Sequence, residues 1–73
     1  MIPVEQIARL AELYDRYNNA LDPLSEQCLQ AKKQFDELTA NLHSTHAPDV
    51  KILDLRFELV RRCREYLQKN PRG

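Results

Sequence analysis

Two histidines and two cysteines are the side chains of this sequence best suited to metal binding or nucleophilic chemistry. His43 and His46 have the spacing of a metal-binding pair, and Asp49 follows three residues later. A closed zinc site needs four ligands, and this segment supplies no fourth one. The residues between the histidines, Ser44 and Thr45, are polar and show no periodicity. We therefore predict a solvated turn here and no metal site.

The cysteines also give no catalytic arrangement. Cys28 and His43 would sit about four turns apart on one helix, too far for a thiol–imidazole dyad. Cys28 and Cys63 could reach the same level of an antiparallel helix pair and form a disulfide under oxidation, but two cysteines are too few for a disulfide framework. We expect two buried thiols, no catalytic residues, no cofactor and no enzymatic activity.

Composition excludes further classes of function. Eleven Lys and Arg residues balance eleven Asp and Glu residues over 73 positions, which lacks the charge of a nucleic-acid coat or a polybasic membrane anchor. The single glycine is residue 73, so the sequence has no glycine-rich loop for phosphate. Its apolar runs are too short for a transmembrane helix or a signal peptide, and we expect a cytoplasmic protein with no membrane partner.

Prolines divide the chain into segments with helical character. Pro3, Pro23 and Pro48 stand where helices could begin, because the first turn of a helix needs no N–H from them. Asp22 and Asp49 are suitable N-cap residues beside two of these prolines. The sequence predicts an all-α fold and a single small helical domain over residues 1–73, with helices over about 3–20, 23–43 and 49–69.

One pattern conflicts with a helix boundary at Pro23. Apolar residues at alternating spacings of three and four continue in phase across the proline, as they do in a coiled coil. A proline inside a helix costs about 3 kcal/mol and disfavours helical geometry at the preceding residue. We expect a break, with one long kinked helix as the alternative. The apolar positions of this seam are Ile7, Leu10, Tyr14, Tyr17, Leu21, Leu24, Cys28, Ala31, Phe35, Leu38 and Leu42.

The second and third predicted helices should form an antiparallel hairpin, because the turn between them is short. Its matching levels would pair Leu38 with Leu53 and Phe35 with Phe57. The apolar arc of the third helix is too broad for one neighbour to cover, and that of the first helix is similarly broad. We expect the first helix to pack on the hairpin as a small bundle or to associate with another molecule like a coiled coil.

The apolar face of the first helix is the candidate partner interface. A chain this short buries little surface on its own, so we expect self-association or a partner. Tyrosines on this face combine a large apolar area with a polar tip, as interface anchors often do. The sequence predicts a non-catalytic helical protein–protein interaction module that forms a homo-oligomer or binds a partner helix. The expected interface residues are Ile7, Leu10, Tyr14, Tyr17 and Leu21.

Two alternatives remain open. One is a small chaperone or assembly factor that shields a partner's helix before assembly. In size and expected hairpin shape the chain is similar to small helical adaptors such as the co-chaperones of secretion needles, a similarity of architecture with no shared motif. A nucleic-acid-associated regulator is the other alternative, because residues 48–73 hold seven basic and four acidic residues. Acidic residues interleave with this basic face, and we do not expect nucleic acid as the partner. The candidate basic contacts are Arg61, Arg62 and Arg64.

Overall fold

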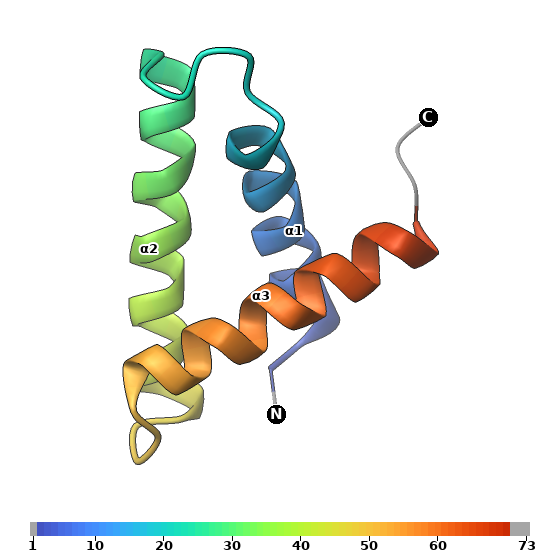
Figure 1. The fold of residues 1–73 in the computed structure, drawn as a ribbon. Coiled ribbons are helices and arrows are strands. Elements are labelled where there is room, and N and C mark those ends of the chain that lie inside the picture. The colour runs from blue at the N-terminus through green and yellow to red at the C-terminus, as the bar shows by residue number, and fades with distance from the viewer. Residues whose placement is uncertain (1, 71–73) are drawn as a thin grey trace.

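The computed structural model describes residues 2–70 and contains three helices within that range (Figure 1). Helix α1 spans Val4–Asn18, α2 spans Glu26–His46 and α3 spans Ile52–Lys69. The expected all-α fold of three helices is confirmed. Helices α2 and α3 each begin three residues later than the sequence predicted, and α2 also continues three residues further.

The starts of α2 and α3 lie beyond the predicted caps. Asp22 accepts a hydrogen bond from the backbone N–H two residues later, at 3.0 Å, and so closes a turn. Ser25 is the N-cap of α2, and its hydroxyl accepts a 3.2 Å hydrogen bond from the N–H of Cys28. Asp49 likewise lies in a turn, and Lys51 occupies the N-cap position of α3. The predictions that Asp22 and Asp49 cap helices were wrong, because both acids belong to the turns that precede the helices.

The chain breaks at Pro23, as expected, and does not form one kinked helix. Helix α1 ends at Asn18, seven residues before the N-cap of α2. The two seam positions that flank the proline, Leu21 and Leu24, are fully exposed and 79% exposed. The continuous apolar spacing across this connection therefore does not correspond to a continuous packed surface.

Helix α1 is the central element of the fold. It runs antiparallel to α2, and α3 crosses it obliquely (Figure 1). Helix α1 packs extensively against both of the other helices, whereas α2 and α3 contact each other over a smaller area near the turn that joins them. The expected small bundle is therefore present, and α1 makes most of its interhelical contacts.

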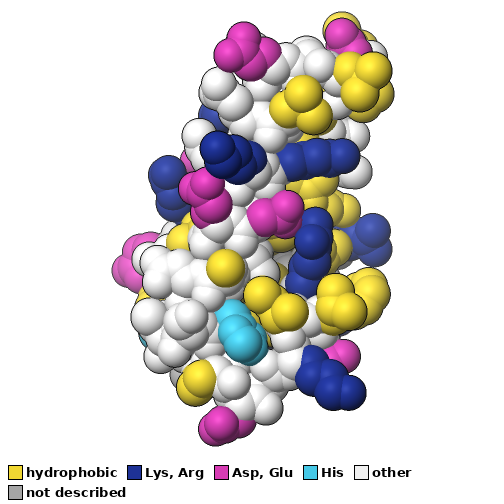
Figure 2. All heavy atoms as spheres, turned by 90° about the vertical axis from the view of Figure 1, so that its left-hand side faces the viewer, with side chains coloured by type: hydrophobic (Ala, Val, Ile, Leu, Met, Phe, Trp, Pro, Cys, Tyr) yellow, Lys and Arg dark blue, Asp and Glu magenta, His cyan; other side chains and the backbone are white. Residues whose placement is uncertain are grey.

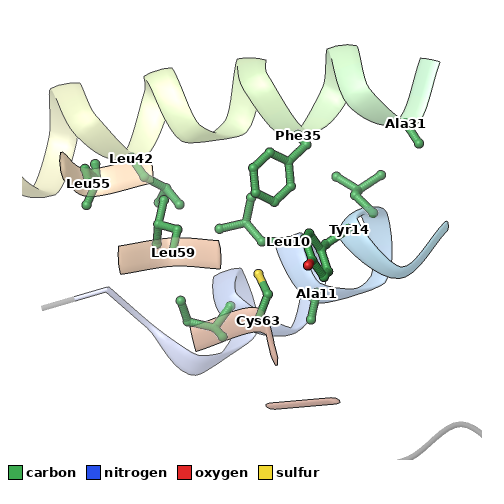
Figure 3. Packing of buried hydrophobic residues seen from close by; sticks show 11 residues of the cluster. Leu10, Ala11, Tyr14, Ala31, Phe35, Leu42, Leu55, Leu59 and Cys63 are labelled. Carbon is green, nitrogen blue, oxygen red and sulfur yellow. The ribbon is translucent and has the colours of Figure 1, made fainter. Parts of the chain in front are cut away.

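One hydrophobic core joins the three helices (Figure 3). Phe35 points from α2 toward Leu10 of α1, and Leu42 lies beside Leu59 of α3. Leu10 and Leu59 are completely buried, and Phe35 is 1% exposed. Burial of each such side chain stabilises a fold by about 1.5–3 kcal/mol. The cluster consists of Ile7, Leu10, Ala11, Leu13, Tyr14, Ala31, Phe35, Leu42, Leu55, Leu59 and Cys63.

The predicted register between α2 and α3 was wrong. Phe57, expected opposite Phe35, is 75% exposed, and Leu53 is 64% exposed. Helix α3 turns another stripe inward, at a spacing of four residues, on the other side of the helix. This buried stripe consists of Leu55, Leu59 and Cys63. The packing of α3 across α1 determines which side of α3 is buried, because α3 packs mainly against α1 and does not lie along α2.

Candidate functional site

Most of the predicted interface on α1 lies inside the fold. Ile7, Leu10 and Tyr14 are buried in the core, and Tyr17 is partly buried against it. Leu21 is fully exposed on the connection between α1 and α2. Helices α2 and α3 cover the apolar face of α1, so that face is not available to a partner in this fold. A partner surface has to be sought elsewhere.

The outward side of α3 carries exposed apolar side chains that line a groove, in contrast to the isolated exposed leucines of the α1–α2 connection. We call Leu53, Phe57 and Val60 the α3 outer stripe; they follow one another at spacings of four and three residues along one side of the helix. Two of them are large and more than half exposed. They line an open groove of about 730 Å³ with Arg56, Arg61, Arg64, Glu65 and Gln68. Exposed apolar surface of this kind is typical of binding sites.

Two tyrosines of α1 lie close to this side of α3 and are surrounded by cations. Tyr14 and Tyr17 make an edge-to-face contact with ring centroids 5.4 Å apart. The Nε of Arg64 donates a 3.0 Å hydrogen bond to the hydroxyl of Tyr14. The Nζ of Lys32 lies 5.9 Å from the ring centroid of Tyr17, within the range of a cation–π interaction. The positive charge of Arg56 also acts on the Tyr17 hydroxyl. Tyr14, Tyr17, Lys32, Arg56 and Arg64 form what we call the basic tyrosine cluster, to which all three helices contribute.

One carboxylate partly balances the cluster. Asp36 of α2 forms a 3.0 Å ion pair with Arg56 of α3, and both side chains are about half exposed. An exposed pair of this kind contributes under about 1 kcal/mol to stability. Burial, and secondarily the neighbouring Tyr14, raises the pKa of Tyr17 above its ordinary 10.0. The Tyr17 hydroxyl is therefore neutral at physiological pH, and the cluster keeps an excess of positive charge.

Hydrophobic and basic side chains lie next to one another on the molecular surface. Along the right-hand edge of Figure 2, hydrophobic patches are interspersed with Lys and Arg side chains. Acidic side chains also occur on this face, but mainly toward its other edge and its two ends. The surface is thus both apolar and basic on the side where α2 approaches α3.

The three predicted basic contacts differ in their surroundings. Arg61 forms ion pairs with Glu58 and Glu65, and Arg62 pairs with Glu58 at 3.2 Å. Hydrogen bonds from the two arginines lower the pKa of Glu58, so its carboxylate stays charged beside them. Arg64, by contrast, forms no ion pair with any residue in the range 2–70 and donates a hydrogen bond to the hydroxyl of Tyr14. The three arginines therefore do not form one basic patch.

Both cysteines lie buried as free thiols within the described chain, as the sequence predicted. The thiol of Cys28 donates to the backbone carbonyl of Tyr17 at 3.6 Å. Cys63 is completely buried in the core, and this burial raises its pKa to about 11. A thiol with this pKa is protonated at neutral pH and a poor nucleophile. Their role in this fold is packing.

The histidine segment is helical, which corrects the expected turn. Helix α2 continues to His46, and the Nε2 of His43 hydrogen-bonds the carbonyl oxygen of Val50, which ties the end of α2 to the start of the next segment. Within residues 2–70, no group of three or more His, Cys, Asp and Glu side chains is arranged to hold a metal ion. His43 is thus partly buried and has a structural contact, whereas His46 is exposed to solvent as predicted.

Comparison with known proteins gives no family. No family model matches the chain, and the searches of curated proteins and of solved structures found no match. None of the helices formed by the described residues is long and apolar enough to cross a lipid bilayer. The α3 outer stripe and the basic tyrosine cluster are therefore the features of the molecule that bear on its function.

Neither feature was predicted from the sequence as a functional site. The excess apolar arc of the third helix was a signal for the α3 outer stripe, since one neighbour cannot cover it. The contact between Tyr14 and Arg64 joins residues 50 positions apart and has no local signal. It depends on the angle at which α3 crosses α1.

Proposed function

We propose that this chain is a non-catalytic protein–protein interaction module whose partner docks on the α3 outer stripe. The observation that supports this most is Phe57, which is 75% exposed at the middle of a helix whose other side lies in the core. Leaving a phenylalanine in water forgoes about 1.5–3 kcal/mol that burial would supply. A docked partner would cover it together with Leu53.

The surroundings of the stripe resemble those of known interfaces in chemical composition. Interface centres are enriched in aromatic residues and arginine, and a few such residues account for most of the binding energy. The α3 outer stripe has Phe57 at its centre and arginines on both sides, at positions 56 and 64. We expect Phe57 to be the main anchor of the interface.

The proposed binding surface is the α3 outer stripe, whereas the sequence predicted the apolar face of the first helix. The class of function, protein–protein interaction, is the same. A chaperone or assembly factor would use the same stripe, and that role stays a prediction, as does a cytoplasmic location. The nucleic-acid alternative loses support because Arg61 and Arg62 are paired with carboxylates on their own helix.

A pair of matched substitutions tests the proposal. Phe57→Asp introduces a charge at the centre of the stripe, and Leu21→Asp introduces the same charge at the fully exposed position on the α1–α2 connection. Both variants should keep the helicity of the parent chain by circular dichroism, because neither removes core contacts. Immobilised parent chain and Leu21→Asp should retain the same proteins from a lysate of the source cells, and Phe57→Asp should lose them.

The opposite pattern would refute the α3 surface. Loss of the retained proteins with Leu21→Asp alone would instead place the interface at the connection, where the sequence analysis put its last residue. Retention by both variants would mean that the bound proteins do not contact the α3 outer stripe at all.

A further inference from the structure

The charge around the α3 outer stripe indicates what kind of partner it binds. We infer that the partner is another protein that presents an acidic amphipathic helix, with its apolar side on the α3 outer stripe and a carboxylate bound to Arg64. This inference rests on the proposed function and adds the chemistry of the partner to it.

The stripe has the dimensions of a helix-binding surface. Its residues continue at the same spacing from Leu53 through Phe57 and Val60 to Arg64 and Gln68, all of which line the groove. At 1.5 Å per residue this length is about 22 Å, which matches a partner helix of about 15 residues. Amphipathic helices bind such surfaces through apolar residues at spacings of three and four.

Arg64 is oriented to bind a carboxylate. Its Nε donates to the hydroxyl of Tyr14, which fixes the plane of the guanidinium. The two terminal nitrogens of Arg64 have no hydrogen-bond partner among residues 2–70, and its side chain is exposed. Two parallel N–H groups in this orientation match the two oxygens of a carboxylate. The hydrogen bond to Tyr14 thus holds Arg64 in a binding orientation before any partner arrives.

The neighbouring charges favour the same ligand. Lys32 and Arg56 are the other cations of the basic tyrosine cluster, and Asp36 is the carboxylate that pairs with one of them. An acidic residue of the partner would thus meet an excess of positive charge, whereas a basic residue would be repelled. Complementary charges of this kind select the partner and its orientation.

A second copy of this chain does not fit the surface equally well. If two α3 outer stripes packed antiparallel, with Leu53 of one against Phe57 of the other, Arg56 would face Arg56 and Asp54 would face Asp54 across the two-fold axis. Like charges in these flanking positions disfavour the pair. The two helices of the chain that carry more acidic than basic residues, α1 and α2, both have their apolar faces in the core. The helix therefore has to come from another protein.

Two model peptides test this inference on the full chain. Both would be helical peptides of about 18 residues, or five turns, with one leucine stripe. One carries glutamate and the other lysine beside the stripe. Each peptide would be titrated into the isotope-labelled chain and its binding followed by NMR chemical shifts. The dissociation constant of the glutamate peptide should be at least about tenfold lower than that of the lysine peptide. The shifted resonances should belong to α3 and to Tyr14.

Substitutions at Arg64 separate charge from geometry. Arg64→Gln should weaken binding of the glutamate peptide roughly tenfold, because it removes a charged hydrogen-bond donor. The same substitution should leave the affinity for the lysine peptide unchanged or slightly higher. Arg64→Lys keeps the positive charge but lacks the two parallel N–H donors of a guanidinium, so it should give an intermediate affinity for the glutamate peptide. The matched control is Arg62→Gln, which makes the same change of charge two residues away on the same helix and should alter affinity by less than about twofold.

Several results would overturn the inference. Equal affinity for the two peptides, or equal effects of Arg64→Gln and Arg62→Gln, would remove the acidic helix as the partner; the proposed function would survive if Phe57→Asp still abolished binding of both. Absence of shifts on α3 with either peptide would refute both proposals. A concentration-dependent dimer through α3, or displacement of the glutamate peptide by a short DNA duplex, would replace the partner with a second copy or with nucleic acid.

Discussion

The two phenylalanines offer a direct test of which side of α3 faces the core. Phe35 is 1% exposed, whereas Phe57 is 75% exposed. Removing a buried phenylalanine down to alanine costs about 3–5 kcal/mol. A chain of this size has a free energy of unfolding of roughly 4–11 kcal/mol, so Phe35→Ala would leave it close to unfolding. Phe35→Leu keeps most of the volume and should cost about 1–1.5 kcal/mol, which can be measured.

Substitution of Phe57 should lower the free energy of unfolding much less. About a quarter of its side chain is covered, so Phe57→Ala should lose about a quarter of the 1.5–3 kcal/mol of full burial, which is below about 1 kcal/mol. Phe57→Leu, which matches the substitution at Phe35, should be neutral within about 0.5 kcal/mol.

Urea unfolding followed by far-ultraviolet circular dichroism measures all of these free energies. The dependence on urea should be the same for each variant, which shows that the same surface is exposed on unfolding. A cost for Phe57→Leu as large as that for Phe35→Leu would contradict the fold. Repeating the measurement at a tenfold higher protein concentration shows whether such a cost comes from self-association.

Two further predictions concern the core thiol and the cap of α2. Burial raises the pKa of Cys63 from an ordinary 9.0 to about 11, so the unfolded chain loses this proton at lower pH than the folded chain does. The contribution of the Cys63 thiol to the free energy of unfolding is constant below about pH 9. Between pH 9 and 11 the free energy of unfolding should fall by up to about 1.4 kcal/mol per pH unit. An equally steep fall in the Cys63→Ala variant would refute this cause. Ser25→Ala should cost about 1 kcal/mol by urea unfolding because the N–H of Cys28 loses its cap, while Ser25→Asp should restore it and Ser44→Ala should cost less than half as much.

The helices could be predicted from the sequence because their limits are set by local chemistry. Proline and short polar residues mark the two connections, and the apolar spacing within each segment predicts one face for packing. The break at Pro23 followed from the geometry of proline itself. The exact starts did not, since Asp22 and Ser25 are both good caps and only the path of the turn decides between them.

A different reason explains why the site could not be predicted from the sequence. Helix α3 has two apolar stripes, and local sequence does not tell whether Leu59 or Phe57 faces inward. The choice depends on the crossing angle with α1, which is a property of the assembled core. The same holds for α1, whose apolar face was expected to bind a partner because its intramolecular neighbours were not known. The contact of Arg64 with Tyr14 exists only after that choice is made.

All three helices contribute residues to the basic tyrosine cluster. The cluster exists only while the chain is folded, so a partner that binds there binds the native state alone and shifts the folding equilibrium toward it. At a partner concentration a hundred times the dissociation constant, this linkage adds about 2.7 kcal/mol to the free energy of unfolding. For a chain with a core this small, that is a large share of its total stability. Proteolytic turnover should therefore be slower in cells where the partner is abundant, and an increase in melting temperature would identify the partner among purified candidates.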